Sequence, residues 1–583
     1  QELAPKSRLP VAFEVRDDYG LKQIQLRYRI TQTEETEETS GDEGADADAD
    51  ADPEAGDADA DADADADAEA EAEVWCGPDP DRIYDDVREL ASVPYEGRLP
   101  DTAGGALALA FAEERLESLG LDPAGDAGGF RQAFSYSQWG LTAPPALDIA
   151  GDTLESAVDF SVFYYSGAGE VTDEIVFAGY GMTVPPYDPT AYPRCPLPST
   201  GYDDFAGLDV AGKIVLVLRH GPRDDSTVPD TCPADPACAS PSCLWNFSTK
   251  AANAALHGAA AVLVVQHYAE VPEILEGATL DEAAFDAGFP TLFVDRTVVE
   301  SYLPDLATWA ANIDAALAPD SRATGVTATV SVGAEIRTAD TANLVGVIPG
   351  SDPTLSSETV VIGAHIDHLG LDPLVGEIMP GADDNASGSA LTLELARDFV
   401  ECGVTPARTM VFMIYNAEEA GLIGSCYQVE NPAFPIGDIA AMFSLDMVGA
   451  GDATGLVVYG STDRSLGWLA DLVEGASAAA GLAYDVLRAD PWDVSDHACY
   501  YYAGAPAVFA TTIGAHLGYH TPEDGIGHIR TDDLGAAAEM MWATLVPLAM
   551  GTEGDFAAKR GGAPGAAPLG ARPDLDGERR ISR

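Results

Sequence analysis

Residues 359–367 read TVVIGAHID, and residues 408–419 read RTMVFMIYNAEE. Each stretch is an apolar run of strand length that stops at residues with titratable side chains. Between them, residues 387–401 read SGSALTLELARDFVE and have the apolar spacing of a helix. Strands that alternate with helices in this way predict βαβ units and a parallel sheet.

The same alternation continues on both sides of these two stretches. Further strands are predicted at 343–350, 439–449, 455–460 and 505–512, and further helices at 419–431 and 465–481. We therefore expect an α/β fold with a doubly wound, largely parallel sheet over residues 335–551.

Two segments precede this region. Residues 79–170 begin with two helical patterns, DRIYDDVRELA and ALALAFAEERLESLG, and form the predicted N-terminal part of the same domain. Residues 171–318 have short apolar strands around one alanine-rich helix. We interpret the second segment as a small, β-rich α/β domain inserted into the first.

The ends of the chain differ in composition from this globular part. Period-two alternation around a DDYG turn predicts a β-hairpin in residues 1–33, whose role the sequence does not indicate. Residues 34–75 form an acidic low-complexity linker, and residues 552–583 are rich in Gly, Ala, Pro and Arg. Disorder is expected for both of these segments.

Charge excludes one class of function. The chain has 97 acidic and 30 basic residues and a net charge of −67, which opposes binding to nucleic acids or anionic lipids. No apolar run approaches the roughly 20 residues of a transmembrane helix. The sequence begins at Gln1 without a signal pattern, so its start is processed or truncated.

The eight cysteines fall into different contexts. Cys195, Cys232, Cys238 and Cys243 lie close together in loop-like sequence, which favours disulfides formed in an oxidising compartment, with the pairing left open. A structural zinc is disfavoured there because the spacing has no CxxC pair and no nearby His. Three others, Cys402, Cys426 and Cys499, are expected to be small buried hydrophobic residues.

Titratable side chains follow the predicted strands repeatedly. In an open α/β sheet the carboxyl ends of parallel strands share one edge, where ligands bind. The residues that we expect at this edge are His365, Asp367, Asp383, Asp384, Glu418, Glu419, Asp446 and His520.

A metal centre explains this convergence better than separate structural roles. Taken singly, acids at a helix start favour the helix dipole, and Asp384 could cap a helix. Together, buried like charges repel unless cations neutralise them. Two divalent ions carry +4, which three carboxylates and a hydroxide balance, with His365 and His520 as neutral ligands.

The motifs AHID, GADDNASG, NAEEAG, LDMVG and YHTPED resemble, in this order, the co-catalytic zinc aminopeptidases of metallopeptidase clan MH, of the aminopeptidase Y and bacterial leucyl aminopeptidase type. With the insert, the resemblance covers about residues 79–551. The insert resembles the protease-associated (PA) domain often found inside these enzymes. The first 75 residues are not covered.

The resemblance implies a set of five metal ligands. Asp384 corresponds to the bridging carboxylate, because it directly precedes Asn in the DNASG element. His365 and Asp446 would complete one zinc site, and Glu419 and His520 the other. Two zinc ions are implied as cofactors, with cobalt or manganese as possible substitutes.

The resemblance also implies catalytic roles. Glu418 matches the general base that takes a proton from water activated by the metal pair, and Asp367 matches the acid that orients the first imidazole. Asp383 is then a neighbour rather than a ligand. Some relatives place a Tyr near Trp492 to stabilise the tetrahedral intermediate; Tyr residues at 500–502 could substitute, but we expect them in the core of an apolar strand.

The predicted function is hydrolysis of N-terminal residues from peptide substrates by a secreted enzyme. The alternatives are a carboxypeptidase or glutaminyl cyclase of the same fold, or an inactive protein that binds partners through its PA domain. The filled ligand positions and Glu418 argue against a cyclase or an inactive protein. The position of the PA domain in the chain suggests that it restricts access to the site.

Overall fold

The computed structural model describes residues 76–163, 165–224, 232–233, 246–268, 288–372, 374, 376–490 and 494–552. The predicted hairpin of residues 1–33, the acidic linker of 34–75 and nearly all of the tail of 552–583 lie outside these residues. Within the described residues, no helix is both long and apolar enough to cross a bilayer.

The C-terminal part of the described chain contains a mixed, largely parallel sheet. Its strands, in spatial order, are β16 (Asp485–Ala489), β15 (Gly455–Tyr459), β17 (Ala507–Thr512), β14 (Ile439–Leu445), β12 (Thr359–His365), β13 (Thr409–Tyr415) and β11 (Arg322–Ile348). The central strands β13, β12, β14 and β17 run parallel, whereas β11 is antiparallel to β13. The predicted fold class is confirmed.

Helices cover both faces of this sheet. Alternate side chains of β12 face opposite ways: Val360 and Ile362 join the larger core, and Val361 joins the smaller one on the other face. The larger core contains residues of α1 (Pro80–Leu90), α2 (Ala103–Ser118), α7 (Gly388–Glu401), α9 (Gly467–Ala479) and α11 (Thr531–Met550). Helices α8 (Ile423–Glu430) and α10 (His497–Tyr502) contact each other, and α10 contacts β14 and β17.

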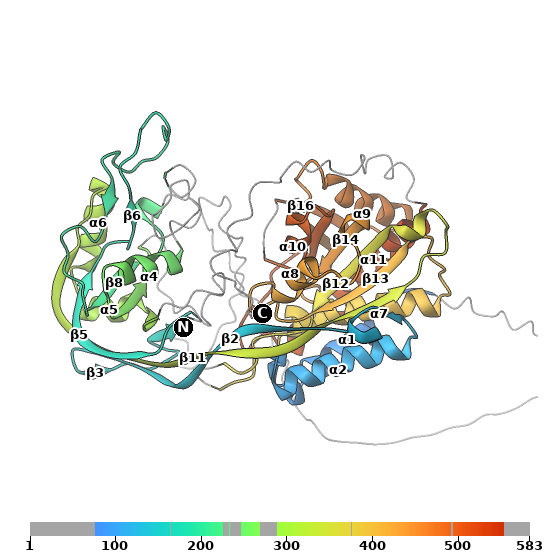
Figure 1. The fold of residues 1–583 in the computed structure, drawn as a ribbon, viewed down its shortest axis with the longest axis horizontal. Helices are drawn as coiled ribbons and strands as arrows, with labels where there is room; N and C mark the ends of the chain where they lie inside the picture. The colour runs from blue at the N-terminus through green and yellow to red at the C-terminus, as the bar shows by residue number, and fades with distance from the viewer. Residues whose placement is uncertain are drawn as a thin grey trace, which may run out of the picture. The chain divides into compact units, whose positions relative to one another are not determined.

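The inserted part has its own sheet, which joins the first through one long strand. Strand β11 pairs with β13 at its end and with β5 at its start, and along most of its length it pairs with β2, as Figure 1 shows. The remaining strands follow in the order β8, β9, β10 and β4. The bounds are β2 (Arg131–Ile149), β4 (Phe160–Val162), β5 (Gly169–Phe177), β8 (Ile214–Leu218), β9 (Ala261–Val265) and β10 (Thr291–Val294).

Three helices and three short strands complete the described part of this region. The helices are α4 (Phe247–Leu256), α5 (Arg296–Tyr302) and α6 (Leu306–Ala316), and the short strands are β3 (Asp152–Thr153), β6 (Thr183–Val184) and β7 (Tyr202–Asp203). The short strand β1 (Asp122–Pro123) instead pairs with the end of β11 that also pairs with β13. Because β4 pairs with β10, the inserted sheet takes in residues that precede the expected boundary at 171.

Three disulfides lie within the described residues, and two of them correct a prediction. Cys195 pairs with Cys232, as the disulfide interpretation of that cluster expected. Cys76 pairs with Cys402, and Cys426 pairs with Cys499. The expectation that Cys402, Cys426 and Cys499 serve only as small buried hydrophobic residues was wrong, because all three form disulfides with partners at distant positions that sequence spacing does not reveal. Cys238 and Cys243 lie outside the described residues.

Candidate metal centre

The predicted site residues meet at the carboxyl ends of the central strands. His365 is the last residue of β12, Asp446 directly follows β14, and Glu418 and Glu419 lie just beyond β13. Asp384 comes from the turn Ala382–Ser387 that leads into α7, and His520 from the loop after β17. These residues form two groups of donor atoms that share Asp384. The first group is His365, Asp384 and Asp446, and the second is His368, Asp384, Glu419 and His520.

The first group surrounds the Nε2 atom of His365. This atom lies 3.5 Å from Asp384 Oδ1 and 3.4 Å from Asp446 Oδ1. His365 Nδ1 donates to the carbonyl oxygen of Asp367 at 3.2 Å. With the proton on Nδ1, the lone pair of Nε2 faces the carboxylates, as a metal-binding imidazole requires.

The second group uses the other oxygen of Asp384. His520 Nε2 lies 3.0 Å from Asp384 Oδ2 and 3.1 Å from Glu419 Oε2. The two oxygens of Asp384 therefore face different donor groups. One carboxylate with this orientation can bridge two ions.

The distances and the burial fit zinc. Ligand atoms about 2.0–2.1 Å from a tetrahedral zinc lie about 3.3–3.4 Å from one another, close to the separations around His365. Asp446 Oδ1 is buried and has no hydrogen-bond partner among the described residues. An unpaired buried carboxylate oxygen is costly, and a cation at this point would satisfy it.

The pKa of His520 reflects the negative charges that surround it. Burial alone would lower its pKa, but the charges of Glu419 and Asp384 and hydrogen bonds to both outweigh burial and raise the pKa to about 10. The carboxylates therefore favour a positive charge between them. In the loaded site, metal ions would supply this charge in place of the proton.

Asp367 contacts the glutamate loop rather than the His365 ring. Its carboxylate lies 3.8 Å from His365 Nδ1, too far for a hydrogen bond, while its two oxygens accept the backbone N–H groups of Glu418 and Glu419 at 3.2 and 3.3 Å. The backbone carbonyl of Asp367, rather than its side chain, orients the His365 ring. The Asp367 side chain fixes the positions of the two glutamates.

Glu418 is buried beside the first donor group. Its Oε2 atom lies 3.8 Å from His365 Nε2. Burial and the negative charges of Glu419, Asp496 and Asp446 raise its pKa well above the ordinary value, although His365 opposes this. Its position allows it to face the same space as the metal ligands.

Asp383 points away from both donor groups. Its carboxylate accepts the N–H groups of Gly449 and Ala450, and His516 Nδ1 lies 2.6 Å from its Oδ2. The backbone of Asp383 and Asp384 is held in turn by Asp524, whose oxygens accept both N–H groups at 2.9 and 3.0 Å. These contacts fix the turn that carries Asp384.

Sequence reasoning missed two residues at this site. His368 follows the HID motif directly, and the third titratable residue in that run was the signal that could have identified it. Arg98 is fully buried in the segment Val93–Arg98, and its guanidinium donates to the carbonyls of Ile366, Pro380 and Gly381 at 2.8, 2.6 and 2.6 Å. Nothing in the local sequence distinguishes it from a surface arginine.

The tyrosines considered for the tetrahedral intermediate occupy a helix rather than the expected strand. Tyr500 lies in α10, is buried, and accepts a hydrogen bond from Tyr415 at 2.9 Å. Tyr501 donates to Asp463. Trp492 lies outside the described residues. Tyr519, whose ring stacks on His520, is 53% exposed and stands at the rim of the site.

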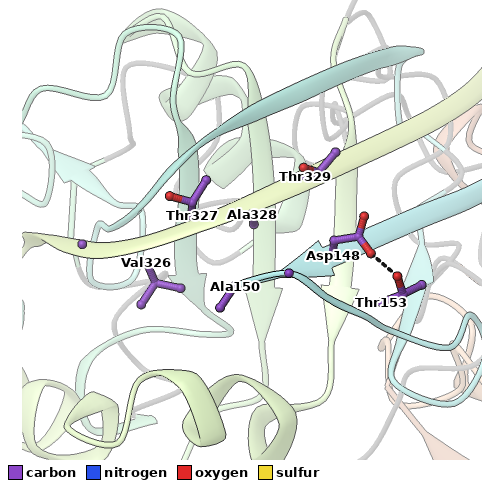
Figure 2. A pocket seen from close by; sticks show the side chains of 9 residues that line it. Asp148, Ala150, Thr153, Val326, Thr327, Ala328 and Thr329 are labelled. Atoms are coloured by element: carbon purple, nitrogen blue, oxygen red, sulfur yellow. Dashed lines mark hydrogen bonds between the residues drawn. The ribbon is translucent and has the colours of Figure 1, made fainter.

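A separate hollow lies in the inserted region. Figure 2 shows it beside the β2–β3 connection and the start of β11, where Asp148 accepts a hydrogen bond from Thr153. Its volume is about 540 Å³, and its lining contains none of the metal-donor residues. It has no cluster of convergent donors comparable to the metal centre.

Comparison with known proteins identifies both parts of the chain. Residues 343–545 match the profile of peptidase family M28, and residues 172–302 match the PA domain. The chain therefore has an M28 peptidase domain with an inserted PA domain. The residues of both donor groups all lie within the M28 match.

Several proteins resemble this chain. An aminopeptidase of Pseudomonas aeruginosa is 28% identical over 368 residues, which cover 62% of this chain and 56% of the relative. Aminopeptidase YwaD of Bacillus subtilis is 29% identical over 195 residues, which cover 32% of this chain and 40% of YwaD. The chain thus spans about half the length of these curated relatives.

Solved structures extend the likeness over most of the chain. An aminopeptidase from Aneurinibacillus sp. strain AM-1 is 26% identical with a TM-score of 0.59, and the match covers 81% of this chain and 94% of that one. A zinc aminopeptidase from Bacillus subtilis, BSAP, shares the fold at 21% identity with a TM-score of 0.54, over 81% of this chain and 96% of that one.

Proposed function

We propose that this protein is a zinc-dependent aminopeptidase that removes N-terminal residues from peptides. The observation that carries the proposal is the pair of donor groups that share Asp384, one facing each of its oxygens. The names of the similar aminopeptidases support the reaction class. Zinc as the metal is supported by the likeness in fold to BSAP, which is a zinc aminopeptidase.

The two donor groups divide the ligands. His365 and Asp446 would hold one ion, Glu419 and His520 the other, and Asp384 both. Bound as a pair, zinc ions would polarise the scissile carbonyl and acidify water at neutral pH. Cobalt or manganese could replace zinc, since imidazole and carboxylate ligands accept these ions as well.

Glu418 is proposed as the general base. It accepts a proton from the attacking water and returns it to the amine that leaves as the peptide bond breaks. The site holds it in place through its backbone, because the Asp367 carboxylate accepts its N–H group. Burial also excludes bulk water from this carboxyl group.

We also propose that the protein works outside the cytoplasm. The disulfides Cys76–Cys402, Cys195–Cys232 and Cys426–Cys499 support this, because such bonds persist in oxidising compartments. The net charge of −67 is compatible with a free protein that does not bind anionic surfaces.

Two peptides that differ only at the N-terminus test the activity. The zinc-loaded protein is incubated with an unblocked peptide and with its N-acetylated twin, and both are followed by mass spectrometry. We expect stepwise loss from the amino end of the unblocked peptide alone. Trimming of both from the carboxyl end would indicate a carboxypeptidase, and no change in either would contradict peptidase action on these substrates.

A further inference from the structure

His368 is the buried imidazole of the second donor group to which the proposed function assigns no ion. Its side chain has no solvent exposure, and its Nδ1 atom lies 2.7 Å from Glu419 Oε1. The opposite oxygen of Glu419, Oε2, is the one that lies 3.1 Å from His520 Nε2. The two histidines therefore contact different oxygens of one carboxylate.

The distances distinguish His368 from His520. The 2.7 Å separation of His368 Nδ1 from Glu419 Oε1 is that of a charge-assisted N–H···O bond. His368 Nδ1 is also 3.7 Å from Asp384 Oδ2, compared with 3.0 Å for His520. His368 is thus closer to Glu419 than to Asp384, whereas His520 is about equally close to both carboxylates.

Packing holds the His368 ring in this position. Gly381 has φ +56°, and a Cβ atom there would lie 2.5 Å from Cγ and Cδ2 of the ring. Only glycine allows the turn before Asp384 to pass this close to the imidazole. The centroid of the His520 ring lies 5.7 Å from that of His368.

We infer that His368 is a positioning residue that holds Oε1 of Glu419 by an Nδ1–H hydrogen bond and leaves Oε2 alone for the second metal ion. The inference rests on the proposed function, because it assigns a role toward the proposed metal pair. A carboxylate whose second oxygen is occupied binds as a one-oxygen ligand. Residues that orient ligands in this way typically change metal affinity about 10–100-fold when they are removed.

Two substitutions in the full chain test this role. His368→Leu removes the donor and keeps a similar volume, while His368→Asn keeps an N–H donor near the position of Nδ1. The metal-free proteins are titrated with Zn²⁺ by calorimetry and with Co²⁺ by absorption spectroscopy. His257→Leu, at the end of α4, is the matched control, because His257 bonds the Asn253 carbonyl far from the donor groups in sequence.

We expect the wild-type protein and His257→Leu to bind two ions with the same affinities. His368→Leu should weaken the second ion about 10–100-fold with little effect on the first, and should change the Co²⁺ spectrum of that ion. His368→Asn should restore affinity and spectrum to near the wild-type values. Thermal unfolding of the metal-free variants checks that all are folded.

Other outcomes would overturn the inference. Wild-type affinity in His368→Leu would show that the hydrogen bond does not matter for metal binding. Failure of His368→Asn to restore the second ion would indicate that the imidazole is itself a ligand. If the wild-type protein bound no zinc, the proposed function would fail first, so the two failures are distinguishable.

Discussion

Glu418 and Glu419 are adjacent in the chain but are assigned different roles. Both N–H groups bind the Asp367 carboxylate, which fixes the backbone between them. Glu419 contacts His368 and His520, whereas Glu418 faces His365 at 3.8 Å. Glu419 can therefore bind a metal ion while Glu418 accepts and returns a proton.

Replacement of Glu418 by Gln should separate these roles. We expect the variant to retain both metal ions and to lose about 10²–10⁴-fold in kcat, because Gln preserves the shape but cannot accept the proton. Metal content and turnover of the unblocked peptide are measured on the same sample. Loss of a metal ion from Glu418→Gln would mean that Glu418 is a ligand.

At the scale of elements, the ligand loops depend on a segment that precedes the M28 match. Arg98 bonds the carbonyl that follows His365 and two carbonyls of the turn before Asp384. Gly97, at φ +68°, passes so close that a Cβ atom would lie 2.2 Å from the Gly370 oxygen. The segment Val93–Arg98 thus holds the loops after β12 in place.

Replacement of Arg98 by Met should weaken the contact between this segment and the loops after β12. Several buried carbonyls would lose their donor, each at about 1–3 kcal/mol, so we expect the free energy of unfolding to fall by at least about 3 kcal/mol and zinc affinity to fall with it. Arg88→Met is the control, since the ion pair of Arg88 with Asp85 is exposed and worth about 0–1 kcal/mol. Denaturant unfolding measures the free energy of unfolding of both variants. Equal losses in Arg98→Met and Arg88→Met would contradict the role of Arg98 in holding the loops after β12.

Parts of this site were predictable because they repeat along the chain. Three of the central strands, β12, β13 and β14, are apolar runs with a His or an acid at their last residue or within four residues after it, and the parallel topology brings those ends together without further information. Arg98 was not predictable, because its partners are backbone carbonyls, which leave no residue pattern. His368 was overlooked because it extends a motif that already contained the expected ligand and the expected orienting acid.

At the scale of the molecule, a disulfide links the first described residue to the M28 domain. Cys76 precedes α1, and Cys402 follows α7, 326 positions later. Helices α1 and α7 also pack together, with Arg82 bonded to Glu394. The bond therefore links the N-terminal helices, and with them the Arg98 segment, to the part of the chain that carries the donor groups.

Removal of this disulfide should cost more stability than removal of another. We expect the Cys76→Ser/Cys402→Ser variant to lose about 2–5 kcal/mol in unfolding free energy. Cys426→Ser/Cys499→Ser opens a loop of only 73 positions and should lose about 1 kcal/mol less through loop entropy. Denaturant curves of the two variants give the comparison. The reverse order would show that strain or packing, rather than loop closure, dominates.

The PA domain can be removed at a point that the strand register defines. Ile149 of β2 and Ala328 of β11 are cross-strand partners, so an Asn-Gly turn between them would close a hairpin. If the PA domain restricts access, the shortened protein should gain kcat/KM on long peptides relative to dipeptides. Equal kinetics of the two proteins on both substrates would remove this hypothesis, and unchanged zinc content would show that the M28 domain is intact.

The central claim is that two metal ions share Asp384. Anomalous diffraction at the zinc edge from crystals of the zinc-loaded protein tests it most directly. The account predicts two peaks about 3.5–4 Å apart, one beside His365 and Asp446 and the other beside Glu419 and His520, with Asp384 between them. A single peak, or a peak at ligand distance from His368, would contradict it.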